Sequence, residues 1–451
     1  MKTNHILLLL SFLLFQSIHL LAQENYLEQY IEEGWSNNLN LIKEQIERNQ
    51  QQAKVDEAYG SFLPNVSFKA DYLLAAGGRD IAFPIGDIIN PVYGTLNQVT
   101  GENRFPTDLE NVNEQFLPNN FHDTRIVINQ PLFNSSIYFN HKAQEQLLSV
   151  QDAKIAAYKV ELKKEIKQSY YNYLKTARVL EIYDSTEVLL KELLRTNKKL
   201  VKYDKATEDV IYSVEYELQK LESERANILQ QRVLAQTYFN TLLNRALNAT
   251  IEEDRSINVQ NIQTFDPKTL LASALQARPE IKQIERGILA QQVVEELQQR
   301  SNLPTLGLQV QAGFQGFGYT FEDQAYATLG FGLQWNIFEG KQKQHRLQQS
   351  QLETQKLRQD LAVVKQQIEL QIREAWYGVQ AAKQQLQAEK AALTSAEKSF
   401  RIIQKRYAAD QAILVEYLDA RTKMTNARIT VSVSEYDLLI QQAMLERSLA
   451  L

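Results

Sequence analysis

The chain of 451 residues is 44% hydrophobic and 23% charged, which excludes a disordered tail, a collagen-like repeat and a bundle of membrane-spanning helices. Its formal net charge of -5 gives no indication of nucleic-acid binding. It has no cysteine, so disulfides, thiolate metal sites, thiol nucleophiles and a lipidated N-terminal cysteine are excluded. Its five histidines are scattered without a metal-binding spacing, and we expect neither a metal ion nor a cofactor.

The first residues have the pattern of a secretory signal peptide. Lys2 precedes an apolar run from Ile6 to Phe15, which continues less purely to Leu21 and ends at Ala22, a small residue suited to cleavage. A membrane anchor is the alternative, but the run is shorter than the roughly 20 residues that a spanning helix needs. We expect residues 1–22 to be removed on export and the mature chain to have no α-helical anchor.

Two stretches almost free of glycine and proline predict very long helices. Neither residue type occurs between Ser135 and Asp266, and only Gly378 occurs after Lys341. The predicted helices are two long ones and two that return alongside them, at about 135–200, 340–407, 209–247 and 413–449. At 1.5 Å per residue, each long helix spans roughly 100 Å.

The second long helix carries a heptad pattern. Its apolar residues follow one another at alternating spacings of four and three, which predicts left-handed supercoiling with neighbouring helices. These seam residues are Ile368, Ile372, Ala375, Val379, Ala382, Leu386, Leu393, Ala396, Phe400, Ile403 and Tyr407.

Four short segments have the two-residue period of strands. They lie at about 65–73, 124–132, 305–314 and 327–337, and apolar residues alternate in them with glycine, glutamine or other polar residues. Each is long enough to cross a bilayer as a tilted strand. Aromatic residues near their ends suggest a membrane girdle, namely Tyr72, Tyr319, Tyr326 and Trp335. A membrane barrel needs about eight strands, so a barrel built from these four must be shared between chains. The alternative is a small soluble sheet with one buried face.

The two halves of the chain repeat one unit. Leu63-Pro64 and Leu303-Pro304 each open a strand, and Lys202-Tyr203 matches Arg406-Tyr407 after a long helix. The domain boundaries predicted from this repeat are 23–247 for the first unit, 248–265 for an equatorial linker and 266–451 for the second unit. Residues 73–123 join two strands and contain four prolines and five glycines, so we expect a long outer loop there.

The duplicated unit resembles that of the TolC-like outer-membrane efflux proteins over essentially the whole mature chain. The resemblance also rests on the run from Leu275 to Ile281 (LQARPEI), which opens a helix, and on Arg406-Tyr407 followed by Leu418-Asp-Ala420. It implies a mixed α and β fold: a homotrimer in the cell outer membrane, with a shared 12-stranded β-barrel and a periplasmic tunnel of coiled-coil helices. It further implies a passive exit duct that docks on a periplasmic adaptor protein and an inner-membrane pump.

The resemblance also indicates which residues would select ions and which would close the periplasmic entrance of the duct. Glu416 and Asp419 lie three residues apart on one face at the start of a returning helix. The resemblance implies that these acids narrow the periplasmic entrance and favour cations. It implies that Tyr407 helps to hold the entrance shut, with Asp209 as the matching acidic partner. The alternatives are an ordinary solvated helix start for the two acids and a packing position in the heptad seam for Tyr407.

The turn before Glu416 departs from the pattern of these proteins. Asp410 replaces the turn glycine and Ala412 replaces a basic residue of the closed state, so we expect the restraint on the entrance to differ. Lysines gather near the other turn, where they suit either the docking of an adaptor's helical hairpin or a solvated helix end: Lys198, Lys199, Lys202 and Lys205.

An enzyme is not expected, since serine and histidine never share a motif and no glycine-rich phosphate loop occurs. Two other interpretations remain: a periplasmic coiled-coil adaptor, and a secreted structural protein without a membrane barrel. An adaptor would need one hairpin flanked by a compact β domain, and the alternating strands disfavour a purely structural protein. Three methionines and no cysteine argue against a relay for soft metals among the possible cargoes, which are drugs, metals and proteins.

Overall fold

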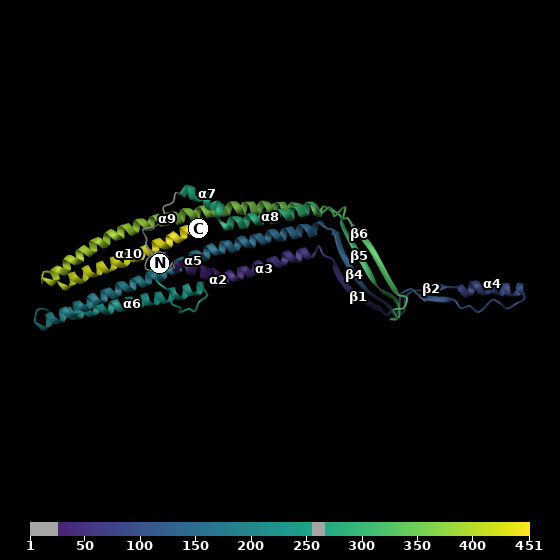
Figure 1. Cartoon of the computed structure of the whole chain (residues 1–451), viewed down its shortest axis with the longest axis horizontal. Helices are drawn as coiled ribbons and strands as arrows, with labels where there is room; N and C mark the ends of the chain where they lie inside the picture. The colour runs from purple at the N-terminus through teal and green to yellow at the C-terminus, as the bar shows by residue number, and fades with distance from the viewer. Residues whose placement is uncertain (1–25, 255–266) are drawn as a thin grey trace, which may run out of the picture. The chain divides into compact units, whose positions relative to one another are not determined.

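The computed structural model describes residues 26–254 and 267–451 (Figure 1). The predicted signal peptide and most of the predicted linker 248–265 lie outside these residues. The described part of the chain forms two compact units, and each unit takes residues from both sequence repeats. One takes the ranges 1–52, 146–290 and 353–451 and holds none of the described strands, and the other takes 53–145 and 291–352 and holds all of them.

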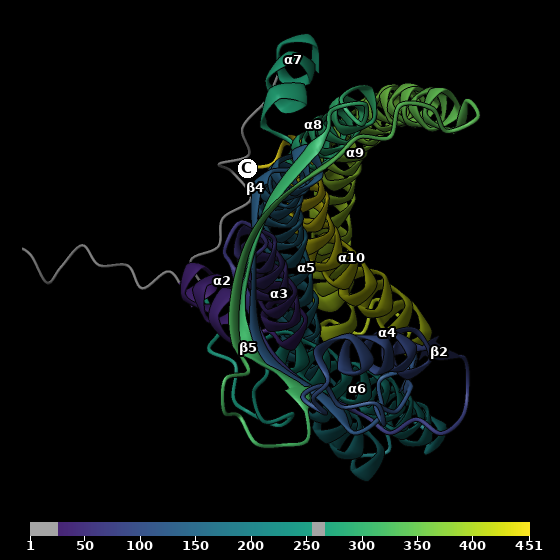
Figure 2. The same ribbon diagram turned by 90° about the vertical axis from the view of Figure 1, so that its right-hand side faces the viewer.

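The main sheet has four antiparallel strands in the order β1, β4, β5, β6. Their bounds are β1 (Asn65–Leu73), β4 (Phe121–Phe133), β5 (Thr305–Phe317) and β6 (Ala325–Gln334). Figure 2 shows the sheet as a curved band. The four strands therefore lie where the alternation predicts, but β6 ends before Trp335, because its partner β5 begins at Thr305, which pairs with Gln334. Within the described residues, β1 pairs only with β4 and β6 only with β5, so both outer edges are open.

The register of the sheet separates an apolar face from a polar one. Apolar residues oppose one another across the strands, as in the pairs Phe68–Ile126 and Val310–Leu329. The apolar face is bare: its large side chains on the two edge strands, listed next, are 63–70% exposed. They are Val66, Phe68, Leu329, Phe331 and Leu333. The expected alternative of a soluble sheet with one buried face is thus wrong for this chain by itself, because nothing in its described part covers that face.

The polar face carries charges and amides. Arg125 forms ion pairs with Asp123 and, at 3.9 Å between Nη2 and Oδ2, with Asp71 on the neighbouring strand. Gln309 Nε2 donates a hydrogen bond to Asn129 Oδ1 over 2.8 Å. A sheet with one bare apolar face and one face of paired charges and amides fits a wall between lipid and water.

Two helical pairs dominate the other unit. α5 (Ser135–Lys202) is followed by α6 (Asp209–Leu242), and α9 (Gln342–Ala408) is followed by α10 (Leu414–Leu449). The predicted heptad seam of α9 is confirmed, since its residues are buried or half-buried, with Ile368 and Ile372 2% exposed. None of the described helices combines the length and apolarity that crossing a bilayer requires.

Shorter helices complete the described part of the chain: α2 (Tyr26–Asn37), α3 (Leu39–Gly60), α7 (Pro267–Ala277) and α8 (Pro279–Gln299). Asn38 separates α2 from α3. The Asn38 side chain caps α3 by accepting the N–H of Leu41, and its amide donates to the carbonyl of Leu242, where α6 ends. The Asn38 side chain thus bonds to two helix ends, which explains why α3 begins after Asn38 and why α6 ends at Leu242, before the predicted end near residue 247.

The Arg-Pro-Glu motif at the start of α8 has a packing role. The Arg278 side chain is 2% exposed and donates to the carbonyl of Arg447, at the end of α10, over 3.0 Å. It also binds Gln371 on α9 and pairs with Glu280 at 3.1 Å. One buried guanidinium therefore holds α8, α9 and α10 together.

The segment 73–123 differs from the expected loop because much of it is folded. It contains β2 (Asp80–Phe83), α4 (Ile85–Thr100) and β3 (Val112–Gln115), and β2 and β3 form a small sheet of their own. Leu73 and Phe121, at its two ends, are paired in the main sheet.

Candidate functional site

The two helical pairs end in turns of the same backbone design. In the first, the N–H of Lys205 donates to the carbonyl of Leu200 over 2.9 Å, and in the second Gln411 donates to Arg406 over 2.8 Å. Asp204 and Asp410 occupy the same place in these turns, with φ of 57° in both. This is the helix ending that usually carries glycine, and aspartate tolerates the left-handed conformation better than most residues. Asp410 therefore keeps the turn that the expected glycine would make.

This shared geometry corrects the match between the repeats. The sequence pairs Tyr203 with Tyr407, but Asp204 and Asp410 are the structurally equivalent positions, so the two tyrosines differ by two residues in their place before the turn. Their surroundings differ accordingly: Tyr203 is 69% exposed, whereas Tyr407 is half-buried. The match rests on residue type, which does not fix the phase of a helix end.

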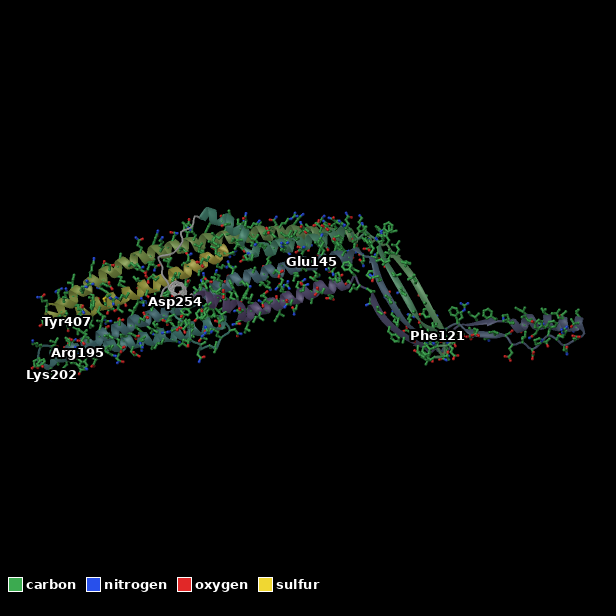
Figure 3. All side chains as sticks on the ribbon, in the orientation of Figure 1. Phe121, Glu145, Arg195, Lys202, Asp254 and Tyr407 are labelled. Carbon is green, nitrogen blue, oxygen red and sulfur yellow. The ribbon has the colours of Figure 1, made fainter. Side chains whose placement is uncertain are left out.

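Tyr407 joins the two helical pairs near these turns, which Figure 3 locates by the labels Tyr407 and Lys202. Its phenol donates a hydrogen bond to Asn197 Oδ1 over 2.6 Å, and Asn197, on α5, is fully buried. The ring packs against Tyr417 of α10, with ring centres 5.2 Å apart. Burial raises the pKa of Tyr407, so the phenol stays protonated at neutral pH and can donate.

A buried ion pair makes a second link between the helical pairs. Arg421, on α10, is 4% exposed, and its Nη2 lies 2.5 Å from Glu217 Oε2 on α6. Losing either partner would leave a charge in a poorly hydrated place, which costs far more than losing an exposed pair. The pair is therefore sensitive to any separation of α6 from α10.

Glu416 and Asp419 lie on the outer side of α10. Both are exposed, while Tyr417 between them turns inward and is buried. Asp419 forms an ion pair with Lys423, one turn further along, at 2.8 Å. The two carboxylates thus point away from the packed helices, as either a pore ring or a solvated helix start requires, and Lys423 partly offsets the charge of one.

Asp209 bonds to Thr207 rather than to Tyr407 among the described residues of this single chain. It is exposed in the first turn of α6 and accepts a hydrogen bond from the hydroxyl of Thr207. Within the described residues, the partner of Tyr407 is Asn197 on α5, one helix away from the expected acid. Of the four lysines near this turn, Lys198 pairs with Glu215 at 3.3 Å, and Lys199, Lys202 and Lys205 are exposed.

The four aromatic residues assigned to a membrane girdle fall into two groups. Tyr72 and Tyr319 contact each other at one end of the sheet, with ring centres 5.9 Å apart, and Trp335 lies at the other end, where its indole donates to the carbonyl of Asn302. Tyr326 is different: it pairs with Gly313 on the polar face, and its hydroxyl donates to Asp123 over 3.0 Å. The girdle position is therefore wrong for Tyr326, whose side chain belongs to the charged face.

Sequence reasoning missed Asn197, Arg421 and Glu217. A signal was present, because Arg421 falls in the apolar heptad of α10, between Tyr417 and Met424, and all three are buried. A polar residue in such a position indicates a specific partner. Among residues 26–254 and 267–451, no group of three histidines or acids is placed to hold a metal ion.

Comparison with known proteins agrees with this architecture. Residues 270–451 match the family described as "Outer membrane efflux protein". The chain is 22% identical to the outer membrane protein TolC of Escherichia coli, over 95% of the chain and 83% of that protein. Its fold is similar to that of the outer-membrane channel OprN, with a TM-score of 0.74 at 16% identity over 95% of this chain and 90% of that one. It is also similar to the CmeC channel of Campylobacter jejuni, with a TM-score of 0.73 at 15% identity over 94% and 86%.

An open four-stranded sheet and two long helical pairs form the fold that these outer-membrane channels share. The second half of the chain matches the outer membrane efflux protein family, and the chain as a whole is similar to TolC-like outer-membrane proteins in sequence and fold. The proteins that it matches are outer-membrane proteins, and this similarity indicates the outer membrane as its location, with the helices on the periplasmic side.

Proposed function

We propose that three copies of this chain form a passive exit duct, closed by the contacts of Tyr407 and Arg421 and made cation-selective by Glu416 and Asp419. Export through the outer membrane is supported by the similarity to outer membrane efflux proteins and to TolC. The trimer, the gate and the selectivity are the parts of the proposal that need support from this chain's own residues.

The observation that carries the trimer is the sheet with two open edges and an exposed apolar face. An unpaired edge in lipid leaves backbone donors and acceptors without partners, and four strands are too few to close a barrel. Pairing of β1 with β6 of another copy satisfies both edges at once. Three copies would give a barrel of twelve strands, with the apolar face toward lipid and the face of Arg125, Asp123 and Asp71 toward water.

The gate rests on the two links between the helical pairs. Widening an entrance formed by the helix ends requires the pairs to move apart, and this movement would break Tyr407–Asn197 and Arg421–Glu217. Each link has one buried partner, Asn197 or Arg421, so breaking it leaves a buried polar group without its partner. The closed arrangement therefore has a specific side-chain origin even though Ala412 replaces the expected basic residue.

Selectivity rests on the exposed carboxylates of Glu416 and Asp419 beside the turn of α9 and α10. In a trimer they would form two rings of three acids, and charged rings select ions by sign. Within one chain the same exposure also suits an ordinary helix start, so conductance must decide between them.

The duct would work with a periplasmic adaptor protein and an inner-membrane pump. The exposed Lys199, Lys202 and Lys205 at the end of α5 suit docking of an acidic helical hairpin from the adaptor. The alternative, that this chain is itself the adaptor, does not explain a sheet whose apolar face is exposed.

The first test is the detergent-corrected mass of the protein extracted from outer membranes. Three chains in each particle support the duct, and conductance in planar bilayers then tests the gate and the acids. A monomer that stays in solution without detergent would overturn the trimer and the barrel together.

A further inference from the structure

The folded extension between β1 and β4 is held together by side-chain amides. Asn90 on α4 both donates to the carbonyl of Leu109 and accepts its N–H, over 2.8 Å and 2.9 Å. Two helical turns on, Asn97 makes the same pair of bonds with Phe105, over 2.8 Å and 3.0 Å. In each pair the asparagine amide bonds to both the N–H and the carbonyl of one residue, so these bonds hold residues 105–109 against α4.

The contact between α4 and this segment is close. A side chain at Gly86 would meet the carbonyl oxygen of Leu109 at 2.1 Å, so only glycine fits there. Asp87 and Asn111 add two more bonds, of 2.9 Å and 3.1 Å. The extension is therefore a defined structure with one face of α4, that of Gly86, Asn90 and Asn97, already covered.

A second face of α4 is apolar and bare. The five residues Ile85, Ile88, Val92, Leu96 and Val99 follow one another at spacings of three or four, the period by which helices pack on helices. All five are exposed, and Ile88, Val92 and Val99 are each more than half exposed. We call these five residues the α4 stripe. A monomer in water rarely leaves such a stripe uncovered.

We propose that the α4 stripe packs against the α4 stripes of the other copies in the trimer, so that the helices form a collar at the outer end of the duct. This inference rests on the trimer proposed above. The extension leaves the main sheet at Leu73, the end of edge strand β1, which is the edge that must pair with β6 of the next copy. Each extension therefore starts at a junction between copies, and symmetry brings identical stripes around one axis.

The distribution of charge on α4 favours the α4 helix of another copy as the partner of the α4 stripe. Asp87 is the one charged residue among the sixteen of α4, and it is bonded to Asn111, away from the stripe. Identical faces that meet around an axis repel one another if they carry charge, and these carry none. A helix lying on anionic lipid would instead be expected to carry lysine or arginine beside its apolar face, and α4 has neither.

The absence of cysteine from the chain makes cross-linking a clean test. Val92→Cys places a thiol in the middle of the stripe, and Gln98→Cys places one on an exposed part of α4 that lies off the stripe. Each full-length variant is oxidised in outer membranes and compared on non-reducing gels, because a disulfide forms only when the two Cα atoms approach within about 7 Å. We expect a covalent dimer as the main product of Val92→Cys and little or none from Gln98→Cys.

The mass of the particles separates failure of the collar from failure of the duct. Trimers in which the two variants cross-link equally poorly or equally well would overturn the collar and leave the duct intact. Monomers would overturn both. A fluorophore attached to the thiol of the Val92→Cys variant and quenched by nitroxide-labelled phospholipid tails would place the stripe in lipid, which also overturns the collar. Adding Ile88→Glu to Val92→Cys should abolish the dimer if the stripe causes the contact.

Discussion

Tyr407 Oη lies 2.6 Å from Asn197 Oδ1, and this hydrogen bond joins the end of α9 to the end of α5. The backbone turns at these ends close on themselves, through Lys205–Leu200 and Gln411–Arg406. Because each turn bonds only within its own helical pair, the two pairs can separate at this end once the side-chain contacts between them break. The bond between Tyr407 and Asn197 is well placed to control that step because its acceptor is fully buried.

Replacing Tyr407 by phenylalanine should favour the open entrance. The ring and its packing on Tyr417 remain, but Asn197 loses a buried partner, which costs on the order of 1–2 kcal/mol in the closed arrangement. An equilibrium shifted by about 1.4 kcal/mol changes roughly tenfold, so the open fraction should rise by about that factor. Single-channel recording in planar bilayers measures it directly.

Tyr203→Phe is the matched control for this measurement. Tyr203 stands near the equivalent turn of the other helical pair but is exposed, so its loss should leave conductance unchanged. Equal conductance of Tyr407→Phe and the unmodified protein would mean that this tyrosine only packs in the seam.

The ion pair of Arg421 and Glu217 should behave as a buried pair. Arg421→Met leaves Glu217 without its partner, and we expect a loss of about 3–5 kcal/mol in the free energy of unfolding. Arg421→Met with Glu217→Leu removes both charges and should recover most of that loss. Denaturant unfolding in detergent, followed by circular dichroism, gives the double-mutant cycle.

The exposed pair one helical turn away provides the contrast. Lys423→Met breaks the ion pair with Asp419, whose partners are both well exposed, and the change should stay below about 1 kcal/mol. If Arg421→Met costs no more than Lys423→Met, the pair does not hold α6 to α10 in the way its burial indicates.

The periodicity of the sequence predicts most of this fold, because alternation and heptads are local signals. Tyr326 shows that the signal can be read further: it lies an odd number of residues from Leu329, so the alternation itself assigns it to the polar face. A position near the end of a strand suggests a girdle residue, but the odd or even spacing from the apolar residues decides which face of the sheet carries its side chain.

What the sequence does not predict is the choice of distant partners. A polar residue in an apolar seam, such as Arg421, indicates that a partner exists, yet Glu217 is some two hundred residues away and is selected by the packing of the helices. The helix α4 is missed for a related reason. Gly86, Pro91 and Gly94 indicate a loop. The helix is instead held by hydrogen bonds from asparagine side chains to residues 105–109, which no local sequence pattern predicts.

Tyr170 should link stability to alkaline pH. Its phenol donates to the carbonyl of Glu252 over 2.8 Å and accepts the N–H of Asp254 over 2.9 Å, and burial raises its pKa above the ordinary value near 10. The folded state therefore keeps a proton that the unfolded chain loses above about pH 10. This contribution is complete below pH 10 and is lost as the pH rises toward the folded-state pKa.

Tyr170→Phe should accordingly have two effects. The free energy of unfolding at pH 8 should fall by about 1–3 kcal/mol, because two backbone groups lose their partner. Between pH 10 and 11 the variant should then lose stability less steeply than the unmodified protein. Tyr216→Phe, at a residue 68% exposed, should change neither quantity. If the free energy of unfolding falls equally steeply with pH for Tyr170→Phe and for the unmodified chain, Tyr170 does not contribute to alkaline unfolding.

Glu416→Ala combined with Asp419→Ala should weaken the preference for cations. In the proposed trimer this change removes six carboxylates from the entrance and leaves Lys423 without its partner, so the local charge becomes more positive by two units for each chain. We expect the reversal potential in a potassium chloride gradient to shift toward zero or beyond it, and block by divalent cations to weaken. Asp360→Ala with Glu374→Ala removes the same charge from exposed positions of α9 far from the turn and controls for net charge. If both double variants shift the reversal potential equally, the acids beside the turn are no more than a solvated start of α10.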